Sequence, residues 1–432
     1  MILRALALFT CAATAAPVSF QRDLAPLLQR RCVSCHGAEQ AKGGYRLDSF
    51  ARLMKPGESD LLTIVAGKPQ ESELARLLHE PSAEDRMPQK ADPLPEMEIA
   101  LIERWISEGA SYDGGSPQRS LAELIRVTML GAAPEKYARA LPVVALAFSP
   151  DGSQVATSGY HEVLVWNVSD GSLAARLGAL PERINSVTWH PRLPLLAVAG
   201  GTPQQWGTIA LVDPTNLAPT RYLCDLPDTA LSVAFSPSGS YLAAGGADRA
   251  VRLYDPATGR ERKVLRLHAD WVQAVTFSPD SERLITASRD RTSRILDPGS
   301  GEVLSSYTSH ETPLVAAAFV GDGKQAWTAA RGGVMHRWDI SSAERKGDAK
   351  GAEYLGLLPL RDGVLAWASD RKLRRFEGIN LKSIWDGPDA FPQAAALSPD
   401  GETLALGTAD GRVTLIAFTD GNVLRAFDAW PR

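Results

Sequence analysis

Phe148-Ser149-Pro150-Asp151-Gly152 ends an apolar stretch with four turn-forming residues, and this short pattern recurs along the chain. Versions of it stand at Trp189-His190-Pro191, Phe235-Ser236-Pro237-Ser238-Gly239, Phe277-Ser278-Pro279-Asp280, Phe319-Val320-Gly321-Asp322-Gly323, Leu360-Arg361-Asp362-Gly363 and Leu397-Ser398-Pro399-Asp400-Gly401. The first five begin 41, 46, 42 and 42 residues apart, and Phe319 and Leu397 are 78 residues apart, or two repeats of 39. Such a fixed period indicates repeated β-structure. We therefore predict seven repeats, of which the sixth is degenerate.

Each repeat consists of short strands separated by turns. In the fourth, residues 274–277, 283–288 and 292–296 are predicted strands. The third strand ends in a related pair in five repeats: Trp166-Asn167, Tyr254-Asp255, Leu296-Asp297, Trp338-Asp339 and Phe376-Glu377. This pattern resembles the WD-repeat β-propeller family over residues 141–427, which implies four strands in each blade. One blade cannot bury both of its faces, whereas seven arranged radially bury each sheet on its neighbours.

Some positions depart from that family's pattern. The Gly-His dipeptide is missing, and His268 and His310 stand near its place in two repeats. Asp248, Asp290 and Asp410 occupy the second turn, where such repeats use a buried aspartate to bridge strands, so we interpret them as structural. Residues 422–427 are suited to an outer strand, and ring closure without an N-terminal strand is left open.

The propeller sequence does not predict a catalytic site. Its histidines lie at different strand phases and no paired acids recur, while the lone Cys224 is interpreted as a buried thiol. Arg249, Arg291 and Arg371 each follow an aspartate in the same turn. Solvated turn residues are the simpler interpretation of these arginines, and an anionic docking surface is the alternative.

A different pattern precedes the repeats, Cys32-Val33-Ser34-Cys35-His36. Two thiols at this spacing can each add to a haem vinyl group, and the adjacent imidazole then lies beneath the iron. A redox dithiol usually accompanies a βαβ unit, and a zinc site needs further Cys or His nearby, but neither context is present. We therefore predict one covalently attached haem c, with His36 as the proximal iron ligand.

Met87, in Arg86-Met87-Pro88, is the predicted sixth ligand of the iron. A thioether suits ferrous iron and raises the reduction potential relative to a second histidine. The surrounding loop is too polar to need a buried methionine for packing. His79, at the end of a predicted helix over 72–78, is the main rival, and an open coordination position is the third alternative. Met54 and Met97 are assigned to core or surface.

Predicted helices flank the haem motif. Asp23 is expected to cap a helix that begins at Leu24, and residues 96–107 form an amphipathic helix that ends at Gly109. Four apolar side chains of the second helix are expected to pack on the first helix and the haem: Leu101, Ile102, Trp105 and Ile106.

Residues 20–110 resemble the planctomycete-type cytochrome c domain. The matching segments are Leu24-Ala25-Pro26-Leu27-Leu28, Cys32-Val33-Ser34-Cys35-His36-Gly37, Lys42-Gly43-Gly44-Tyr45-Arg46-Leu47-Asp48, Gly67-Lys68-Pro69, Ser72-Glu73-Leu74, Arg86-Met87-Pro88, Trp105-Ile106 and Glu108-Gly109-Ala110. The resemblance implies haem on Cys32 and Cys35, with His36 and Met87 as axial ligands. Gln89 departs from the family, which often has a second proline at this position.

The first 16 residues, MILRALALFTCAATAA, are typical of a secretory signal peptide. Arg4 supplies the positive end, and Ala13-Thr14-Ala15 is a cleavage site for signal peptidase. Cys11 falls within the discarded part; a first hydrophobic helix of the folded protein is the alternative interpretation. No later segment approaches 18 unbroken apolar residues. We therefore expect a periplasmic or otherwise exported mature chain without a membrane span.

Composition fits a folded protein, and the motifs and repeats above divide it into two domains. The 432 residues are 44% hydrophobic and 22% charged, which argues against disorder, and a net charge of −4 gives no basic footprint for nucleic acid. Four cysteines are too few for a disulfide scaffold. We predict a signal peptide over 1–16, a small all-α cytochrome c-like haem domain over 17–113, a linker over 114–138 and an all-β seven-bladed propeller over 139–432.

These features favour an electron carrier over an enzyme with its own substrate. The predicted function is single-electron transfer by the haem, with a redox partner protein docked on the propeller or at the haem edge. One alternative is a haem-based redox or ligand sensor on an interaction scaffold. Another is a propeller oxidoreductase that feeds electrons to the haem, but no second cofactor motif supports it. The oligomeric state, the identity of the partner and the potential are left open by the sequence.

Overall fold

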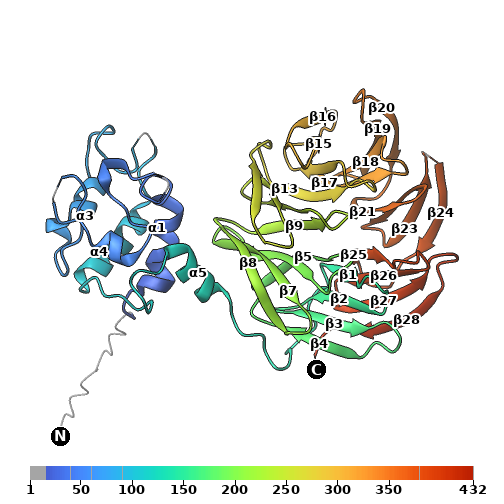
Figure 1. The fold of residues 1–432 in the computed structure, drawn as a ribbon, viewed down its shortest axis with the longest axis horizontal. Helices are drawn as coiled ribbons and strands as arrows, with labels where there is room; N and C mark the ends of the chain where they lie inside the picture. The colour runs from blue at the N-terminus through green and yellow to red at the C-terminus, as the bar shows by residue number, and fades with distance from the viewer. Residues whose placement is uncertain (1–15, 39, 60, 90, 379, 432) are drawn as a thin grey trace, which may run out of the picture. The chain divides into compact units, whose positions relative to one another are not determined.

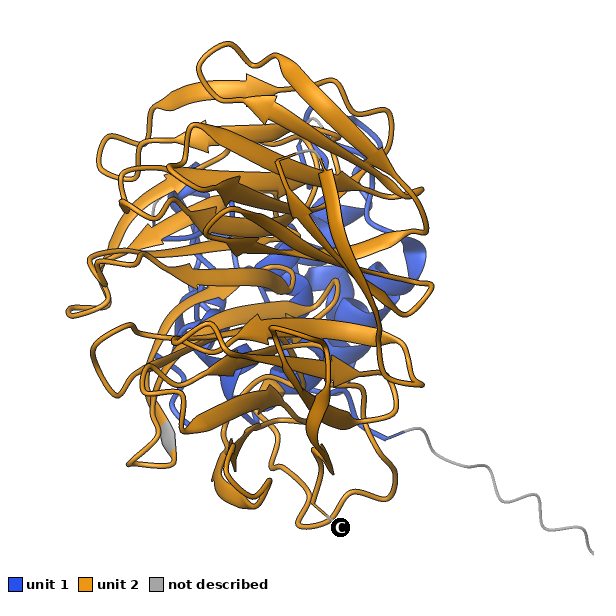
Figure 2. Cartoon of the chain, turned by 90° about the vertical axis from the view of Figure 1, so that its right-hand side faces the viewer, with its two compact units in different colours: residues 1–128 blue, residues 129–432 orange. Residues whose placement is uncertain are grey.

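The computed structural model describes residues 16–38, 40–59, 61–89, 91–378 and 380–431. The chain divides into two compact units, Met1–Thr128 and Met129–Arg432 (Figures 1 and 2). Residues 1–15, which hold nearly all of the predicted signal peptide and Cys11, lie outside the described residues. Among the described helices, none combines the length and the apolar character needed to cross a bilayer. The division between the units falls within the segment 114–138 that we expected to be a linker.

The first unit is helical. Its elements are η1 (Phe20–Leu24), α1 (Ala25–Arg31), η2 (Lys42–Gly44), α2 (Phe50–Leu53), η3 (Pro69–Glu71), α3 (Glu73–Leu78), α4 (Glu96–Ser107) and α5 (Leu121–Met129). Helix α4 has the bounds predicted from its apolar spacing, and Gly109 follows it with φ +101°. Trp105 of α4 packs on Phe20, with 5.5 Å between the ring centroids, so α4 and the start of the chain share one core.

The chain becomes helical earlier than we predicted. The Ser19 hydroxyl accepts a hydrogen bond from the Arg22 amide at 3.0 Å, and the Ser19 amide donates to the Asp23 carboxylate at 2.9 Å. This reciprocal pair satisfies backbone donors at the helix start, as in a capping box. The prediction that Asp23 caps a helix beginning at Leu24 is therefore wrong, because Ser19 is the cap and Asp23 lies in the first turn.

The second unit is a seven-bladed β-propeller (Figure 1). Each blade is a four-stranded antiparallel sheet with its strands in chain order. Blades 1 to 3 are β1 (Leu146–Phe148), β2 (Gln154–Ser158), β3 (Val163–Asn167), β4 (Leu173–Leu177); β5 (Arg183–Trp189), β6 (Leu196–Thr202), β7 (Trp206–Asp213), β8 (Ala218–Leu226); β9 (Ala230–Phe235), β10 (Leu242–Gly246), β11 (Val251–Tyr254) and β12 (Glu261–Leu265).

The last four blades repeat this arrangement, and the degenerate sixth repeat still forms a complete blade. Blades 4 and 5 are β13 (Val272–Phe277), β14 (Leu284–Ser288), β15 (Ser293–Leu296), β16 (Val303–Tyr307); β17 (Leu314–Val320), β18 (Gln325–Ala330), β19 (Val334–Asp339) and β20 (Arg345–Lys350). Blades 6 and 7 are β21 (Tyr354–Leu360), β22 (Gly363–Ala368), β23 (Lys372–Glu377), β24 (Asn380–Asp386); β25 (Pro392–Leu397), β26 (Thr403–Thr408), β27 (Arg412–Ala417) and β28 (Val423–Asp428).

The recurring Ser-Pro-Asp-Gly pattern is the turn between the first and second strands of a blade. In blade 1 the Ser149 hydroxyl donates to the Asp151 carboxylate at 2.6 Å and accepts from the Gln154 amide at 3.0 Å. Gly152 completes the turn with φ +72°, a conformation that glycine adopts without a steric penalty. The repeated sequence therefore encodes where each blade reverses its direction.

Two of the three second-turn aspartates, Asp248 and Asp290, have nearly buried side chains that pair with a residue outside the turn, in agreement with a structural role, whereas Asp410 is exposed and bonds within its own turn. Asp248 pairs with Arg252, with 2.5 Å between the carboxylate oxygen and the guanidinium nitrogen. Asp290 accepts from Nδ1 of His268 at 2.9 Å, and Nε2 of the same ring lies 2.8 Å from the Thr286 hydroxyl. Asp410 accepts from the Thr408 hydroxyl.

Two histidines form a buried stack beside blade 5. The rings of His310 and His336 lie 4.0 Å apart and nearly parallel, and both residues are almost fully buried. His310 bonds to the Thr328 hydroxyl at 2.8 Å, and His336 to the Tyr307 hydroxyl at 3.0 Å. Burial, the neighbouring His336 and then Arg345 lower the pKa of His310 to about 3, and burial followed by Arg345 also lowers that of His336.

This stack predicts that mild acid destabilises the propeller. The pKa of an unfolded histidine is about 6.5, whereas that of folded His310 is about 3. Between these two pH values, the unfolded chain binds a proton at His310 that the folded chain does not bind. The free energy of unfolding should therefore fall as the pH drops from about 6.5, by up to about 1.4 kcal/mol per pH unit for each such group. Urea unfolding between pH 7 and pH 5, followed by the β-sheet circular dichroism signal, measures this slope.

The control separates His310 from surface histidines. In the His310→Gln variant the slope should become shallower, whereas His79→Gln, at a side chain that is 58% exposed, should leave it unchanged. An identical slope for wild type and His310→Gln would contradict the assignment.

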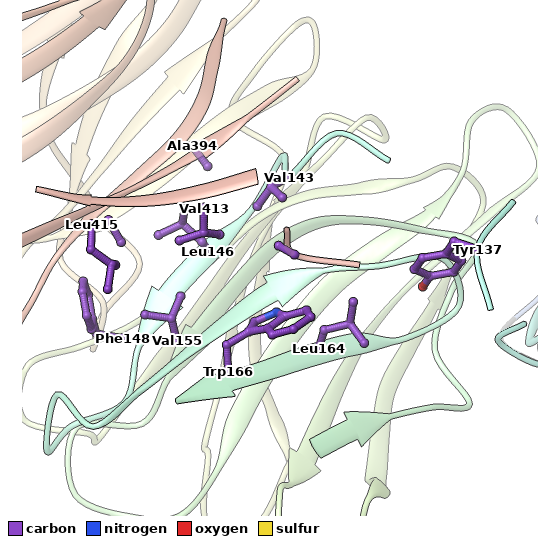
Figure 3. Close-up of a cluster of buried hydrophobic side chains, with 12 residues drawn as sticks. Tyr137, Val143, Leu146, Phe148, Val155, Leu164, Trp166, Ala394, Val413 and Leu415 are labelled. Carbon is purple, nitrogen blue, oxygen red and sulfur yellow. The ribbon is translucent and has the colours of Figure 1, made fainter. Parts of the chain in front are cut away.

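Blade 7 closes the ring directly onto blade 1, which answers the question left open by the sequence. All four strands of blade 7 come from the C-terminal part of the chain, and the interface with blade 1 is a cluster of buried apolar side chains (Figure 3). Trp166 of β3 packs on Phe427 of β28, with 5.5 Å between the ring centroids. Across the same interface the Val143 amide donates to the Thr408 carbonyl at 3.0 Å. We call this interface the seam.

Candidate functional site

The first unit contains a cavity of about 420 Å³, a size typical of small-molecule and cofactor sites. Its wall combines residues that follow α1, residues of α3, residues between Lys42 and Thr63, and a last group made of Met87, Pro88, Gln89 and Leu94. All four residues that the sequence proposed as haem-binding lie on this wall, although 51 residues separate His36 from Met87: Cys32, Cys35, His36 and Met87.

The end of α1 brings the thiols and the imidazole to one wall. The Cys32 amide donates to the Leu28 carbonyl at 2.9 Å as the last bond of α1. The chain then turns tightly, because the Cys35 and His36 amides both donate to the Cys32 carbonyl, at 3.1 and 3.0 Å. Three reactive side chains thus leave a single turn on the side of the cavity.

One contact determines which nitrogen of a neutral His36 ring carries the hydrogen. Its Nδ1 lies 3.3 Å from the Tyr45 carbonyl oxygen, which can only accept, so Nδ1 is the donor and carries the hydrogen. The neutral ring then keeps a lone pair on Nε2, the form in which histidine ligates a metal. The Tyr45 ring also packs edge-on against the imidazole, with 5.5 Å between the centroids. His36 is therefore oriented and in the tautomer that an axial iron ligand requires.

No disulfide involves the three cysteines that the structure describes. Cys32, Cys35 and Cys224 are all free, and packing around Cys32 raises its thiol pKa to about 12. Cys32 thus holds its proton at neutral pH. Cys224, interpreted from sequence as a buried thiol, is partly buried against the apolar cluster between blades 2 and 3 and has no part in this cavity.

The structure places the two candidate sixth ligands differently. The Met87 amide donates to the Leu77 carbonyl at 3.0 Å, which ties the Met87 segment to the end of α3 beside the cavity. His79 is not among the lining residues, and its Nε2 instead contacts the Glu103 carboxylate at 2.8 Å. Met97 is 84% exposed on α4.

The apolar wall of the cavity is a feature that we did not predict. We expected Leu101, Ile102, Trp105 and Ile106 to form core that packs on the first helix and the haem. Ile102, Trp105 and Ile106 are buried as expected of core, and Trp105 packs on Phe20, but none of the four lines the cavity. The apolar lining instead comes mainly from six leucines: Leu47, Leu61, Leu74, Leu77, Leu78 and Leu94. Leu74, Leu77 and Leu78 are spaced as one face of a helix, and this signal was present in the sequence.

Charged groups stand at the cavity's edge. Arg31 pairs with Glu98 of α4 at 3.0 Å, while Lys42, Glu58 and Glu73 add charges of both signs to the lining. The described residues hold no group of three or more His, Cys, Asp or Glu arranged to bind a bare metal ion. The cavity offers two thiols, one oriented imidazole and one thioether, enclosed by leucine side chains. This set of groups fits an iron porphyrin.

Comparison with known families agrees with this geometry. Residues 32–90 match the family model for planctomycete cytochrome C. Residues 138–167, 227–255 and 259–297 match the WD domain, G-beta repeat. A "Probable serine/threonine-protein kinase PkwA" from Thermomonospora curvata is 43% identical over 61 residues, which are 14% of this chain and 8% of that protein.

The chain therefore joins a cytochrome c-like region to a seven-bladed WD40-type β-propeller, and both resemblances drawn from the sequence are confirmed. The cytochrome match indicates haem c as the cofactor, and the WD40 match indicates a module for protein interaction.

Proposed function

We propose that this protein is an exported monohaem c-type cytochrome that transfers single electrons, with the propeller as the docking module for its redox partner. The observation that carries the proposal is the convergence of Cys32, Cys35, His36 and Met87 on one leucine-walled cavity. The signal-peptide pattern of residues 1–16 supports export. Export also agrees with the proposed cofactor, because covalent haem attachment in bacteria takes place outside the cytoplasm.

Each residue has a distinct task in this proposal. Cys32 and Cys35 would anchor one haem through two thioether bonds, and His36 would offer Nε2 to the iron while its Nδ1 donates to the Tyr45 carbonyl. Met87 would offer a thioether as the second protein ligand, which favours the ferrous state. Haem, when bound, supplies an iron that accepts and releases one electron. The leucine walls exclude water, which limits the reorganisation that accompanies a change of charge.

The test is a redox titration of the full-length holoprotein and of Met87→Ala. Wild type should be reduced and reoxidised by one electron and should show the near-infrared sulfur-to-iron absorption band. Met87→Ala should lose that band and lower the potential by on the order of 0.1 V, since the thioether no longer stabilises ferrous iron. His79→Ala is the matched control, and both properties should remain unchanged in it.

Two outcomes would contradict the proposal. If wild type lacks the band and His79→Ala rather than Met87→Ala shifts the potential, the ligand assignment is wrong. If ferrous wild-type protein binds carbon monoxide rapidly, the sixth position is open, and the ligand-sensing alternative replaces electron transfer.

A further inference from the structure

One end of the propeller carries exposed arginines on neighbouring blades. In a four-stranded antiparallel blade, the turn between the second and third strands lies at the same end as the connection to the next blade. We call this the second-turn end. Four exposed arginines lie there on three consecutive blades: Arg249, Arg266, Arg291 and Arg331. We refer to these four residues as the arginine surface.

The topology brings these residues to one side of the ring. Strand β13 of blade 4 packs against β9 of blade 3 and against β17 of blade 5, so the three blades are neighbours. Arg249, Arg291 and Arg331 occupy the same turn in each blade, and Arg266 lies in the connection between blades 3 and 4. The hydrogen bond from His268 to Asp290 holds that connection beside the turn of blade 4.

Acidic groups at this end are largely engaged elsewhere. Asp248 pairs with the buried Arg252, Asp290 with His268, and Asp270 with Arg289 at 3.6 Å. Glu311 is an exposed acid in the connection to blade 5. Within the part of the chain that the structure describes, none of the four arginines has a carboxylate at ion-pair distance.

Arg371, which the sequence grouped with Arg249 and Arg291, is different. Its guanidinium donates to the Asp389 carbonyl at 2.7 Å, so that cation is already bound within blades 6 and 7. The arginine surface therefore belongs to blades 3 to 5 and is not a ring around the whole face.

Two of these arginines have a backbone conformation that is uncommon for residues other than glycine. Arg249 and Arg291 have φ of +69° and +71°, and Gly411 fills the equivalent turn of blade 7 with φ +83°. Beside them Arg289 stacks on the half-buried Trp271, 4.4 Å from the ring centroid, and adds an aromatic edge to the surface.

We propose that the arginine surface binds an acidic segment of a partner protein. Guanidinium groups pair with carboxylates through two parallel hydrogen bonds, so an Asp- or Glu-rich chain crossing three blades matches their chemistry. The WD40 match favours a protein partner, and a net charge of −4 disfavours nucleic acid. The inference rests on the docking role of the propeller proposed above, but not on the haem.

The experiment uses full-length protein and immobilised poly-L-glutamate, with binding followed by biolayer interferometry at low and high NaCl. The test variant is Arg249→Asn/Arg291→Asn/Arg331→Asn, because asparagine tolerates positive φ. Its affinity should fall by about tenfold or more, since each exposed ion pair contributes a factor of about two to five. High salt should weaken the wild type in the same way.

The matched control removes three exposed arginines from first-to-second and third-to-fourth strand turns at the opposite end, with the same change of net charge: Arg192→Asn/Arg260→Asn/Arg361→Asn. Its affinity should stay within about twofold of wild type. Equal binding by wild type and the test variant would overturn the proposal. So would duplex DNA that binds as tightly as polyglutamate and loses binding in the same variant. Loss of haem or of redox activity leaves this measurement unaffected, so the two proposals fail separately.

Discussion

Replacing both thiols in Cys32→Ser/Cys35→Ser should abolish covalent haem attachment completely. Each sulfur provides one thioether bond, and a hydroxyl at the same position does not add to a vinyl group under these conditions. His36 alone cannot retain the cofactor through denaturation. The purified variant should show no haem-stained band on a denaturing gel and no visible absorption. Without its cofactor, the cavity would leave six leucines without an apolar partner, so the first unit should also unfold more easily.

Cys224→Ser is the matched control for this experiment. It makes the same substitution at a free cysteine in the propeller, and full haem content should remain. Haem that survives denaturation in the double variant would show that attachment involves other residues. The single variants Cys32→Ser and Cys35→Ser should each keep one thioether bond. The amount of haem that they retain after denaturation should lie between that of the double variant and that of wild type.

The second large effect is expected at the seam between blades 1 and 7. Trp166→Ala should lower the free energy of unfolding of the propeller by about 3–5 kcal/mol, because it removes a large buried ring. Trp166 is 5% exposed, packs on Phe427, and donates from Nε1 to the buried Thr157 hydroxyl at 2.9 Å. The substitution also deprives Thr157 of that partner. Urea unfolding followed by circular dichroism gives the change.

Hydrogen exchange distinguishes a seam defect from general loss of stability. In Trp166→Ala, amides of blades 1 and 7, such as that of Val143, should exchange faster than those of blades 3 to 5. Trp166→Phe keeps a ring but loses the donor, and should cost only about 1 kcal/mol. Met97→Ala, at an exposed side chain, should change nothing. A uniform rise in exchange across all blades would contradict a local role at the seam.

Much of the fold could be predicted because its signals are local. The Ser-Pro-Asp-Gly turns and strand alternation are set by hydrogen bonds within a few residues, such as those of Ser149 with Asp151 and Gln154. Helix α4 was located from its own apolar spacing. The start of the first helix was wrong because Ser19 and Asp23 compete as caps, and their reciprocal bond decides the outcome. The outer strand predicted over 422–427 is present as β28, but ring closure itself depends on packing between distant segments, which a local pattern does not reveal.

The same distinction between local signals and contacts of distant segments applies to the candidate site. Cys32, Cys35 and His36 could be found from the sequence because they lie within five consecutive residues. In the structure they line one cavity together with Met87. The carbonyl of Tyr45 and the leucines of α3 come from other segments, so their approach to the cavity is a tertiary property. Trp105 has the apolar spacing expected of a haem wall, yet its ring packs on Phe20 in the core instead.

No strand from the start of the propeller completes blade 7, so the ring closes only through packing between blades 1 and 7. This arrangement affects the order of folding. The bond from Arg425 to the Asp170 carbonyl joins residues 255 positions apart, so it cannot form before almost the whole propeller has been synthesised. Contacts this distant in sequence slow folding, and partly made chains expose apolar surface. Blade 1 therefore keeps an uncovered apolar flank until blade 7 has formed, and this partly folded state is the one most exposed to aggregation.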